Sequence, residues 1–282
     1  MKGVAGALRA SPPLLVGTII VGLLALVALL APWITPYDPR AQSRTELAPP
    51  SSTHLLGTND VGADNFSRLV FGSRTTLVVA VAATALILFI GLAVGLTAGL
   101  RGGLVDTMLM RVVDVFLALP LLPLLIFIAA LATPSLTLSI LLIGLFAWPP
   151  TARIVRSQTL SLRSRGFVDS ARGFGASPLY VMGRHLIPAL GPVIAANLVY
   201  VAGVAVAVEA GLAFLGLGDP AAVSWGQDLN RALNHMSIRT GTVWLWWLLP
   251  LGAALTVAIS GITLIGMGLE PRFNPRTSRA RT

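Results

Sequence analysis

The sequence has no cysteine and only one lysine, Lys2, in 282 residues. Without cysteine, disulfide bonds, thiolate metal ligands and cysteine nucleophiles are all excluded. With Lys2 as the only lysine, a Walker A phosphate-binding loop is excluded as well, because that loop is a glycine-rich turn ending in Lys-Ser or Lys-Thr. If the work of this protein consumes ATP, another chain must therefore bind the nucleotide.

Charged residues are also scarce. They make up 11% of the chain, against about 25% in an average soluble domain. Apolar residues make up 55%, and the mean hydropathy is +0.82. The ionisable groups are too few to cover the surface of a water-soluble globule, so the composition excludes a soluble enzyme and a disordered chain. It indicates a protein whose solvent is largely lipid.

Six apolar stretches are long enough to cross a bilayer as α-helices, which takes about 20 residues. Prolines interrupt the third, at Pro120 and Pro123, and the fourth, at Pro149-Pro150. Such kinks are tolerated where neighbouring helices or cavity water satisfy the freed carbonyls. The first stretch is too long for a signal-peptide core, so we expect it to be retained. The sequence predicts an all-α, polytopic membrane protein with six transmembrane helices: Leu14–Ile34, Leu77–Leu100, Thr107–Ala132, Leu136–Ile154, Leu190–Leu215 and Val243–Leu269.

The basic residues are divided unevenly between the two sides of these helices. Fourteen of the 20 fall on the side of the two termini and the Arg153–His185 loop, and six fall on the other side, where acidic residues match them. Cytoplasmic loops carry the excess of Lys and Arg, so we expect a protein of the cell (inner or plasma) membrane with cytoplasmic N- and C-termini. The net charge of +9 then faces anionic lipid, and no nucleic-acid partner is expected.

Three glycines, Gly91, Gly95 and Gly99, recur every four residues in the second span. Small residues at this spacing lie on one helix face and let two helix backbones approach closely, which is the usual packing device in lipid. We expect this face to be a helix–helix interface.

The long loop before the fifth span carries a pattern of two helices around a bend. An apolar stripe on one helix face is formed at i, i+4 and i+7 by Phe167, Ala171 and Phe174. Gly175 follows at a position where helices commonly end in a left-handed residue, and Ser177-Pro178 is typical of an N-cap with proline at the first helical position. We expect two short amphipathic helices against the cytoplasmic face of the membrane, the second closed by Pro188. The residues alone leave two interpretations open: a pair of helices that lies in the membrane interface without binding a protein, or a docking site for another protein.

This loop resembles the signature of ABC importer permeases, in which Glu-Ala-Ala, three residues, Gly, nine residues and Ile-x-Leu-Pro form the helix that docks into the ATPase. Asp169-Ser170-Ala171 stands at Glu-Ala-Ala, Gly175 at the glycine and His185-Leu186-Ile187-Pro188 at the end. Asp169 and Ser170 keep the charge sign and the small size of the signature residues. His185 resembles the variant of the dipeptide, oligopeptide and nickel branch. The resemblance implies an ATPase-coupling site of Asp169, Ser170, Ala171, Gly175, Ala176, Ser177 and Pro178.

Further segments resemble the same branch in the family's order, so that the resemblance covers nearly the whole chain. They are His54–Leu77, with Ala63 in place of an expected arginine, Arg111–Asp114 with Leu119-Pro120, Trp148–Arg156, Glu209–Gly218 and Ser224–Gly226. The resemblance implies the type I ABC importer permease fold. It also implies a permease subunit of an ATP-driven importer, with no enzymatic activity of its own. Peptides are the expected cargo, and nickel or another metal chelate is the alternative.

The same resemblance implies the partners. They are a homologous second permease subunit, two ABC ATPase subunits, an extracytoplasmic solute-binding protein, a peptide substrate and membrane lipid, with no cofactor and no metal. We expect three parts of the chain: residues 1–75 with the first transmembrane helix and an extracytoplasmic loop, residues 76–270 with the core permease domain and its coupling loop (residues 157–188), and a basic cytoplasmic tail at residues 271–282.

Rival classes are an intramembrane enzyme and an ion channel. The three histidines, His54, His185 and His235, fall in different loops and in no His-Glu-x-x-His arrangement. An ion channel would need rings of charged residues or a filter sequence rich in carbonyls, and neither is evident in the sequence. Glu209 is the one carboxylate well inside a span. We expect Glu209 and Asn197 to line the translocation pathway, and the alternative for Glu209 is a structural hydrogen bond to another helix.

The predicted orientation is testable because the chain has no native cysteine. A cysteine placed at Ser164 is expected to react with a membrane-impermeant thiol reagent only from the cytoplasmic side, and one placed at Ser43 only from outside. The reason is the fourteen-to-six division of basic residues. The measurement is labelling of intact cells and of inverted vesicles, and the reversed pattern would refute the orientation.

Overall fold

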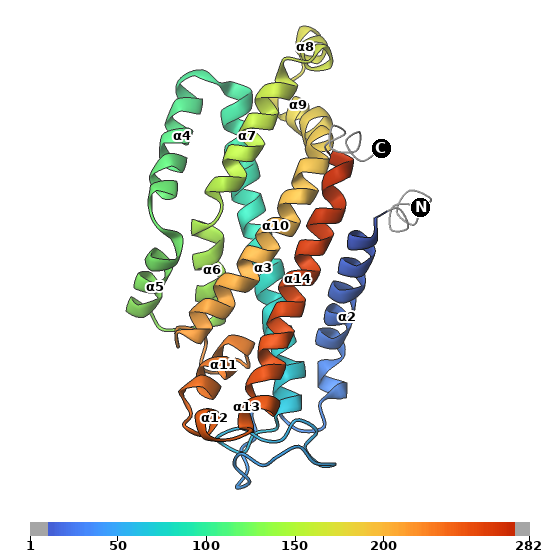
Figure 1. Ribbon diagram of the computed structural model, residues 1–282. Helices are drawn as coiled ribbons and strands as arrows, with labels where there is room; N and C mark the ends of the chain where they lie inside the picture. Colours follow the sequence, from blue (N-terminus) through green and yellow to red (C-terminus); the bar gives the residue numbers. More distant parts are fainter. Residues whose placement is uncertain (1–10, 274–282) are drawn as a thin grey trace.

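The computed structural model describes residues 11–273, apart from the side chains of residues 167–169, 172, 239–240 and 270–273. These residues form a bundle of long helices between two ends, which we call the α8 end and the α11 end after the helices found there (Figure 1). The helices are α2 (Pro12–Ile34), α3 (Asn65–Arg101), α4 (Gly103–Ala118), α5 (Leu121–Leu131), α6 (Leu136–Phe146), α7 (Pro149–Arg163), α8 (Gly166–Gly173), α9 (Pro178–Val181), the π-helical turn η1 (Met182–Leu186), α10 (Ile187–Phe214), α11 (Trp225–Asn234), α12 (Ser237–Thr240), α13 (Val243–Trp246) and α14 (Leu248–Phe273).

Within the described residues, five of the six predicted spans are present, and the count reaches six when the bent pair α4 and α5 is taken as one span. Five spans are long and apolar enough to cross a membrane: Pro12–Ile34, Asn65–Arg101, Leu136–Arg163, Pro178–Phe214 and Val243–Leu269. The third span in chain order is the pair α4 and α5, which is bent by 81°. Pro120 lies at the bend as the N-cap of α5, because proline has no N–H to continue the hydrogen-bond ladder of α4.

The central helix of the bundle is α3, which contacts α2, α4, α6, α7 and α10. It begins at Asn65, well before the predicted start of its span at Leu77. The early start has a local cause: Asp64 is the N-cap, and its Oδ2 accepts a hydrogen bond from the backbone N–H of Ser67 at 2.8 Å. This bond satisfies one of the N–H groups that a helix start leaves without a partner.

The glycine face of α3 packs against α7, as the four-residue spacing predicted. A Cβ atom placed on Gly95 would lie 2.6 Å from the carbonyl oxygen of Ala152, and one on Gly91 would lie 2.5 Å from the methyl group of Thr151. One turn further along, a Cβ atom on Gly99 would lie 2.7 Å from the Cβ of Thr159. Because lipid provides no hydrophobic force between helices, such close backbone approach is what holds membrane helices together. The packing of α3 on α7 therefore depends on these glycines.

Helices α2 and α14 pack by the same means, a contact that was not predicted from the sequence. A Cβ atom on Gly17 of α2 would lie 2.6 Å from the carbonyl oxygen of Gly261 of α14. A Cβ atom on Gly268 of α14 would lie 2.5 Å from the Cβ of Leu14. Two terminal spans that are far apart in the sequence thus lie side by side (Figure 1).

The prediction that Pro188 closes a short helix was wrong. The chain continues from α9 through η1 into α10 as one span, Pro178–Phe214, and Pro188 lies in the first turn of α10. The backbone N–H of Ile187 donates to the carbonyl oxygen of Met182, five residues back. This widened turn lies directly before Pro188, whose ring would crowd the preceding turn of a regular α-helix.

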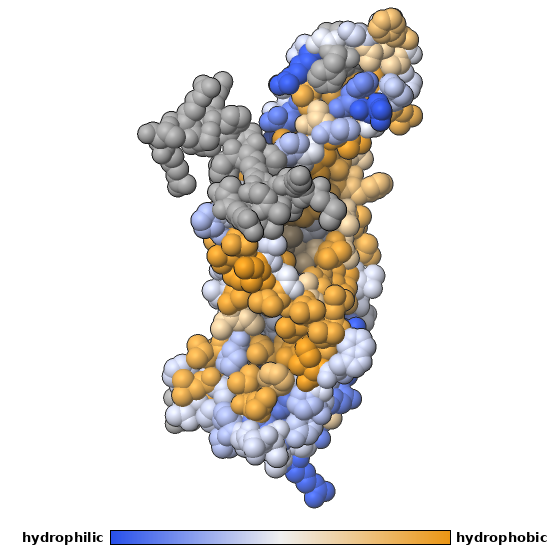
Figure 2. Space-filling view, turned by 90° about the vertical axis from the view of Figure 1, so that its right-hand side faces the viewer, coloured by the Kyte–Doolittle hydropathy of each residue, from blue (hydrophilic) through white to orange (hydrophobic). Residues whose placement is uncertain are grey.

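The two ends of the bundle differ from its middle. An apolar band lies between them, and both ends are more polar (Figure 2). The start of α2 and the end of α14 lie at the α8 end, whereas α11–α13 and the loop at 35–64 cover the α11 end (Figure 1). Of the predicted basic tail, the structure describes only the backbone of residues 271–273, and the rest lies outside the described residues.

The packing of α3 on α7 generates a stability prediction. We expect Gly95→Val to lower the free energy of unfolding by at least about 1–3 kcal/mol, the usual cost of overpacking, because the added side chain meets backbone that cannot move aside. The measurement is thermal unfolding of the purified protein in detergent. Gly22→Val is the matched control, since a Cβ atom at Gly22 meets no atom within 4 Å. Equal stability of the two variants would contradict the assigned packing.

Candidate functional site

The predicted bend of the coupling loop is present. α8 ends at Gly173, and Gly175 has φ of +80°, in the left-handed region that favours glycine. The backbone N–H of Ala176 donates to the carbonyl oxygen of Ala171 at 3.0 Å, which closes the end of α8. Gly175 therefore turns the chain between the two helices of the loop, and its backbone conformation decides their relative direction.

The second helix of the loop also starts as predicted. The Oγ of Ser177 accepts a hydrogen bond from the backbone N–H of Tyr180 at 3.2 Å, and Pro178 is the first helical residue. The base of this helix is anchored, because Val181 and Leu186 are fully buried in an apolar cluster with residues of α3, α7 and α10. Anchoring at the base gives the loop a defined position relative to the spans.

The tip of the loop is exposed. Phe174 is 94% exposed and Leu179 is 79% exposed, and α8 projects beyond the end of the bundle (Figure 1). Phe174 does not pack on the bundle. The residues around the bend line a shallow cavity of about 640 Å³. Large apolar side chains presented in this way are typical of a surface that another protein covers.

Of the seven predicted coupling residues, six are described with their side chains and all cluster in this loop. Ser170, Gly175, Ser177 and Pro178 are exposed, and Ala171 and Ala176 are half-buried. The backbone of Asp169 lies in α8, whereas its side chain lies outside the described residues. Contact of these residues with an ATPase remains a prediction.

The two predicted pathway residues lie on α10, and the structure does not bring them together. Asn197 is buried, and its Nδ2 donates to the Oγ1 of Thr151 on α7 at 2.8 Å. Glu209 is also buried, and its Oε1 accepts a hydrogen bond from the Oγ of Ser224, the N-cap of α11, at 2.8 Å. The second carboxylate oxygen of Glu209 is buried without a hydrogen-bond partner. In this conformation Asn197 therefore joins α10 to α7, and Glu209 joins α10 to α11.

At the α11 end, an ion pair fixes α11 to the start of α3. Arg68 and Asp228 are both buried, and Nη2 of Arg68 lies 2.6 Å from Oδ1 of Asp228. Nη1 of Arg68 donates to the carbonyl oxygen of Pro39 at 2.8 Å. Burial raises the pKa of the Asp228 carboxyl, and the neighbouring Arg68 guanidinium acts in the opposite direction. Removing one member would leave a buried charge without a partner, which costs about 3–5 kcal/mol.

Two further ion pairs join α4 to α7. Nη2 of Arg156 lies 2.6 Å from Oδ2 of Asp106, and Nη2 of Arg153 lies 2.6 Å from Oδ1 of Asp114. The second pair is about half exposed in both side chains, so its contribution to stability is small. These pairs hold the broken third span against the fourth.

From the sequence, the acidic residues outside the spans are known only to match the arginines there in number. The sequence could not assign Arg68 to Asp228, because 160 residues separate them. The sole signal was their position: Arg68 lies in a segment that resembles the permease branch, and Asp228 follows shortly after another, Ser224–Gly226. Within the residues that the structure describes, no group of three or more His, Asp or Glu side chains could hold a metal ion.

Comparison with known families divides the chain into two matched regions. Residues 91–279 match the family described as binding-protein-dependent transport system inner membrane component. Residues 3–50 match the family described as the N-terminal TM domain of oligopeptide transport permease C. The first match covers more than half of the chain and includes the coupling loop, Asn197 and Glu209.

Individual relatives agree with these matches. A Brucella suis biovar 1 (strain 1330) protein named as a peptide transport system permease is 36% identical over 93% of this chain and 87% of its own length. The nickel transport system permease protein of Escherichia coli (strain K12) is 38% identical over 91% of this chain and 92% of its own. Among solved structures, the inward-facing MetNI methionine ABC transporter matches with a TM-score of 0.57 and 20% identity, over 77% of this chain and 97% of that chain. This last likeness shows the type I importer permease fold.

Proposed function

The chain belongs to the family of binding-protein-dependent transport system inner membrane components, and from this premise we propose how its residues couple ATP hydrolysis to transport. It is a multi-pass inner-membrane permease subunit of an importer, and peptides are the cargo that its relatives favour. The proposed partners are a homologous second permease, two ATPase subunits and an extracytoplasmic solute-binding protein. The proposed orientation places the α8 end in the cytoplasm and the α11 end outside.

The observation that carries this proposal is the exposed coupling loop on an anchored base. Phe174 and Leu179 present apolar surface beyond the bundle, and we propose that the ATPase covers it, with Asp169 to Pro178 as the contact segment. Val181 and Leu186 tie the same segment to the spans. A displacement of the ATPase can then move the spans, because a packed helix transmits motion as a rigid element.

The route of transmission follows the fifth span. Pro178–Phe214 runs without interruption from the coupling loop to the α11 end. Asn197 and Glu209 lie on this helix and connect it to α7 and α11. ATP-driven closure of the two ATPases would favour one arrangement of the helices over the other, which is a population shift driven by differential contacts.

We further propose that Asn197 and Glu209 line the pathway when the helices rearrange. The support is chemical: one oxygen of Glu209 has no hydrogen-bond donor, so it can accept one from the amino group of a peptide. The alternative role of Glu209 is purely structural, as the acceptor that holds Ser224 and the start of α11.

Nickel or another metal chelate is the second candidate cargo, because the nickel permease of Escherichia coli is 38% identical to this chain. Peptide transport is favoured by the names of other relatives. These include a D,D-dipeptide transport system permease protein of Escherichia coli (strain K12), which is 32% identical over 95% of this chain.

The coupling role predicts a specific effect at Gly175. We expect Gly175→Val to lower peptide uptake about tenfold or more per ATP hydrolysed, because a β-branched residue at positive φ costs about 1–3 kcal/mol and the bend should change direction. A Cβ atom at this position meets no atom within 4 Å, so the effect arises from the backbone alone. The measurement is uptake and ATP hydrolysis by the complete importer in proteoliposomes.

Gly175→Asn is the matched control for that experiment. Asparagine has a similar size to valine but adopts the left-handed region much more readily, so it is expected to retain more coupling than valine. If both variants transport like the wild type, the bend at Gly175 has no part in coupling.

The pathway role predicts that the charge of Glu209 matters. We expect Glu209→Gln to preserve assembly and to reduce uptake, because the amide oxygen can still accept the hydrogen bond of Ser224 while the charge is lost. Ser224→Ala is the control that removes the hydrogen bond and keeps the carboxylate. The measurement is parallel uptake of a labelled peptide and of nickel, which also identifies the cargo. Normal uptake by Glu209→Gln, with impaired assembly in Glu209→Leu and Ser224→Ala, would leave only the structural role.

A further inference from the structure

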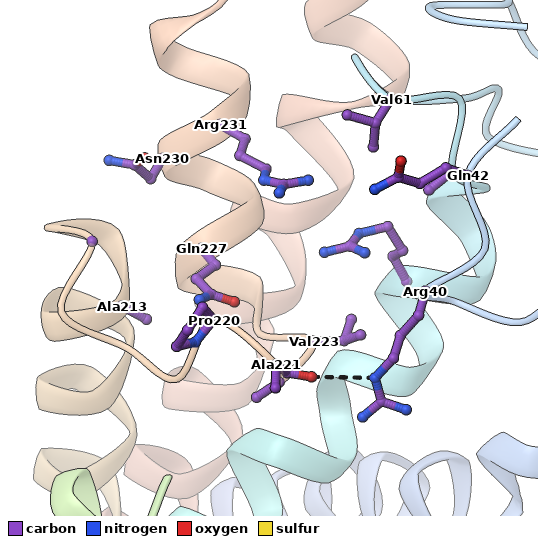
Figure 3. A pocket seen from close by; sticks show the side chains of 14 residues that line it. Arg40, Gln42, Val61, Ala213, Pro220, Ala221, Val223, Gln227, Asn230 and Arg231 are labelled. Carbon is purple, nitrogen blue, oxygen red and sulfur yellow. Dashed lines mark hydrogen bonds between the residues drawn. The ribbon is translucent and has the colours of Figure 1, made fainter. Parts of the chain in front are cut away.

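A basic pocket opens at the α11 end. It has a volume of about 380 Å³ and lies between the loop at 35–64, the start of α3, the end of α10 and α11. Figure 3 shows Arg231 of α11 and Gln42 of the loop directed toward one another across it. The pocket belongs neither to the coupling loop nor to the buried contacts of Asn197 and Glu209.

The three arginines of the pocket are held in different ways. Arg68 is neutralised by Asp228 and donates to a backbone carbonyl. Nε of Arg40 donates to the carbonyl oxygen of Ala221 at 3.2 Å (Figure 3), and its guanidinium lies over the ring of Phe71, 5.7 Å from the centroid. Arg231 is exposed. In the described part of the chain, neither Arg40 nor Arg231 forms an ion pair. Arg231 lies near enough to Asp228 to act on the pKa of its carboxyl, but that carboxylate is already bound by Arg68, so both guanidinium groups stay without a salt-bridge partner of their own.

The remaining lining adds further hydrogen-bonding groups without negative charge. Gln42, Gln227 and Asn230 contribute side-chain amides, and none of the described residues that line the pocket is acidic. Nε2 of Gln227 and Nδ2 of Asn230 already donate to the carbonyl oxygens of Asp219 and Phe214, which keeps these two amides in place. A concave site with unmatched guanidinium groups and no carboxylate selects an anion, and guanidinium geometry suits a carboxylate in particular.

We propose that this pocket binds an aspartate or glutamate side chain on the surface of the importer's solute-binding protein and thereby holds that protein over the α11 end. The proposal rests on the proposed function and orientation, which place this end outside the cell membrane. Most of the pocket is lined by the loop at 35–64, α11 and the segment before α11, which lie at the α11 end of the bundle (Figure 1). In the proposed orientation, a protein approaching from outside meets these segments first. Its two unmatched arginines are exposed, which suits reversible, salt-sensitive docking.

The test measures the affinity of the importer's own solute-binding protein for the complete importer in lipid nanodiscs. Arg40→Gln and Arg231→Gln are each expected to raise the Kd by about tenfold at low salt, because each removes a charge-assisted hydrogen bond. The difference from wild type is expected to shrink in high salt, since salt screens exposed charges. Arg44→Gln is the matched control, an exposed arginine of the same loop that does not line the pocket.

A charge-reversal pair identifies the carboxylate. Arg231→Glu is expected to weaken docking further, and an Asp→Arg or Glu→Arg change on the binding protein is expected to restore it. Unchanged Kd in both glutamine variants, with wild-type docking intact, would overturn the pocket assignment alone. An altered response to free peptide with unchanged docking would also overturn it, in favour of a cargo site. Wild-type importer that binds no solute-binding protein would instead overturn the proposed function.

Discussion

Apolar side chains gain nothing by leaving lipid, so the close approach of α3 to α7 through Gly91, Gly95 and Gly99 is the contact on which the bundle depends. Because α3 also contacts α2, α4, α6 and α10, its position decides where the other spans can lie. Ion pairs and hydrogen bonds between the helices then stabilise the close packing that the glycines allow. Arg156 with Asp106 ties the broken third span to α7, and Asn197 ties α10 to the same helix.

The fifth span connects the two functional ends of the chain. The coupling loop begins at α8, and the helix that follows it continues past Glu209, which accepts a hydrogen bond from Ser224 at the α11 end. A widened turn at Met182–Leu186 accommodates Pro188 and keeps the helix continuous. In the proposed orientation, this continuity relates the end at which we propose the ATPase binds to the end at which we propose the binding protein docks, because a continuous helix moves as one element.

The α11 end combines firmly held charges with charges left available. Arg68 forms an ion pair with Asp228 and donates to the carbonyl oxygen of Pro39, and it thereby fixes α11 to α3. Arg40 and Arg231 lie beside it on an open pocket. Breaking the buried ion pair of Arg68 and Asp228 would strongly destabilise the fold, which suits a structural role. The exposed guanidinium groups of Arg40 and Arg231 can bind and release a partner reversibly, which suits recognition.

The sequence alone determined the apolar spans, the glycine interface and the bend at Gly175, because hydropathy, four-residue spacing and helix-end chemistry are local properties. It also indicated the family, through short motifs in order. It did not determine that Pro188 lies within a continuous span, since the alternative to helix termination is a widened turn that depends on packing around Val181 and Leu186. Nor could it assign Arg68 to Asp228, gather Arg40 and Arg231 into one pocket or supply Ser224 as the partner of Glu209. Those contacts join residues distant in the chain, and only the tertiary fold decides which of the available charges and hydroxyl groups meet.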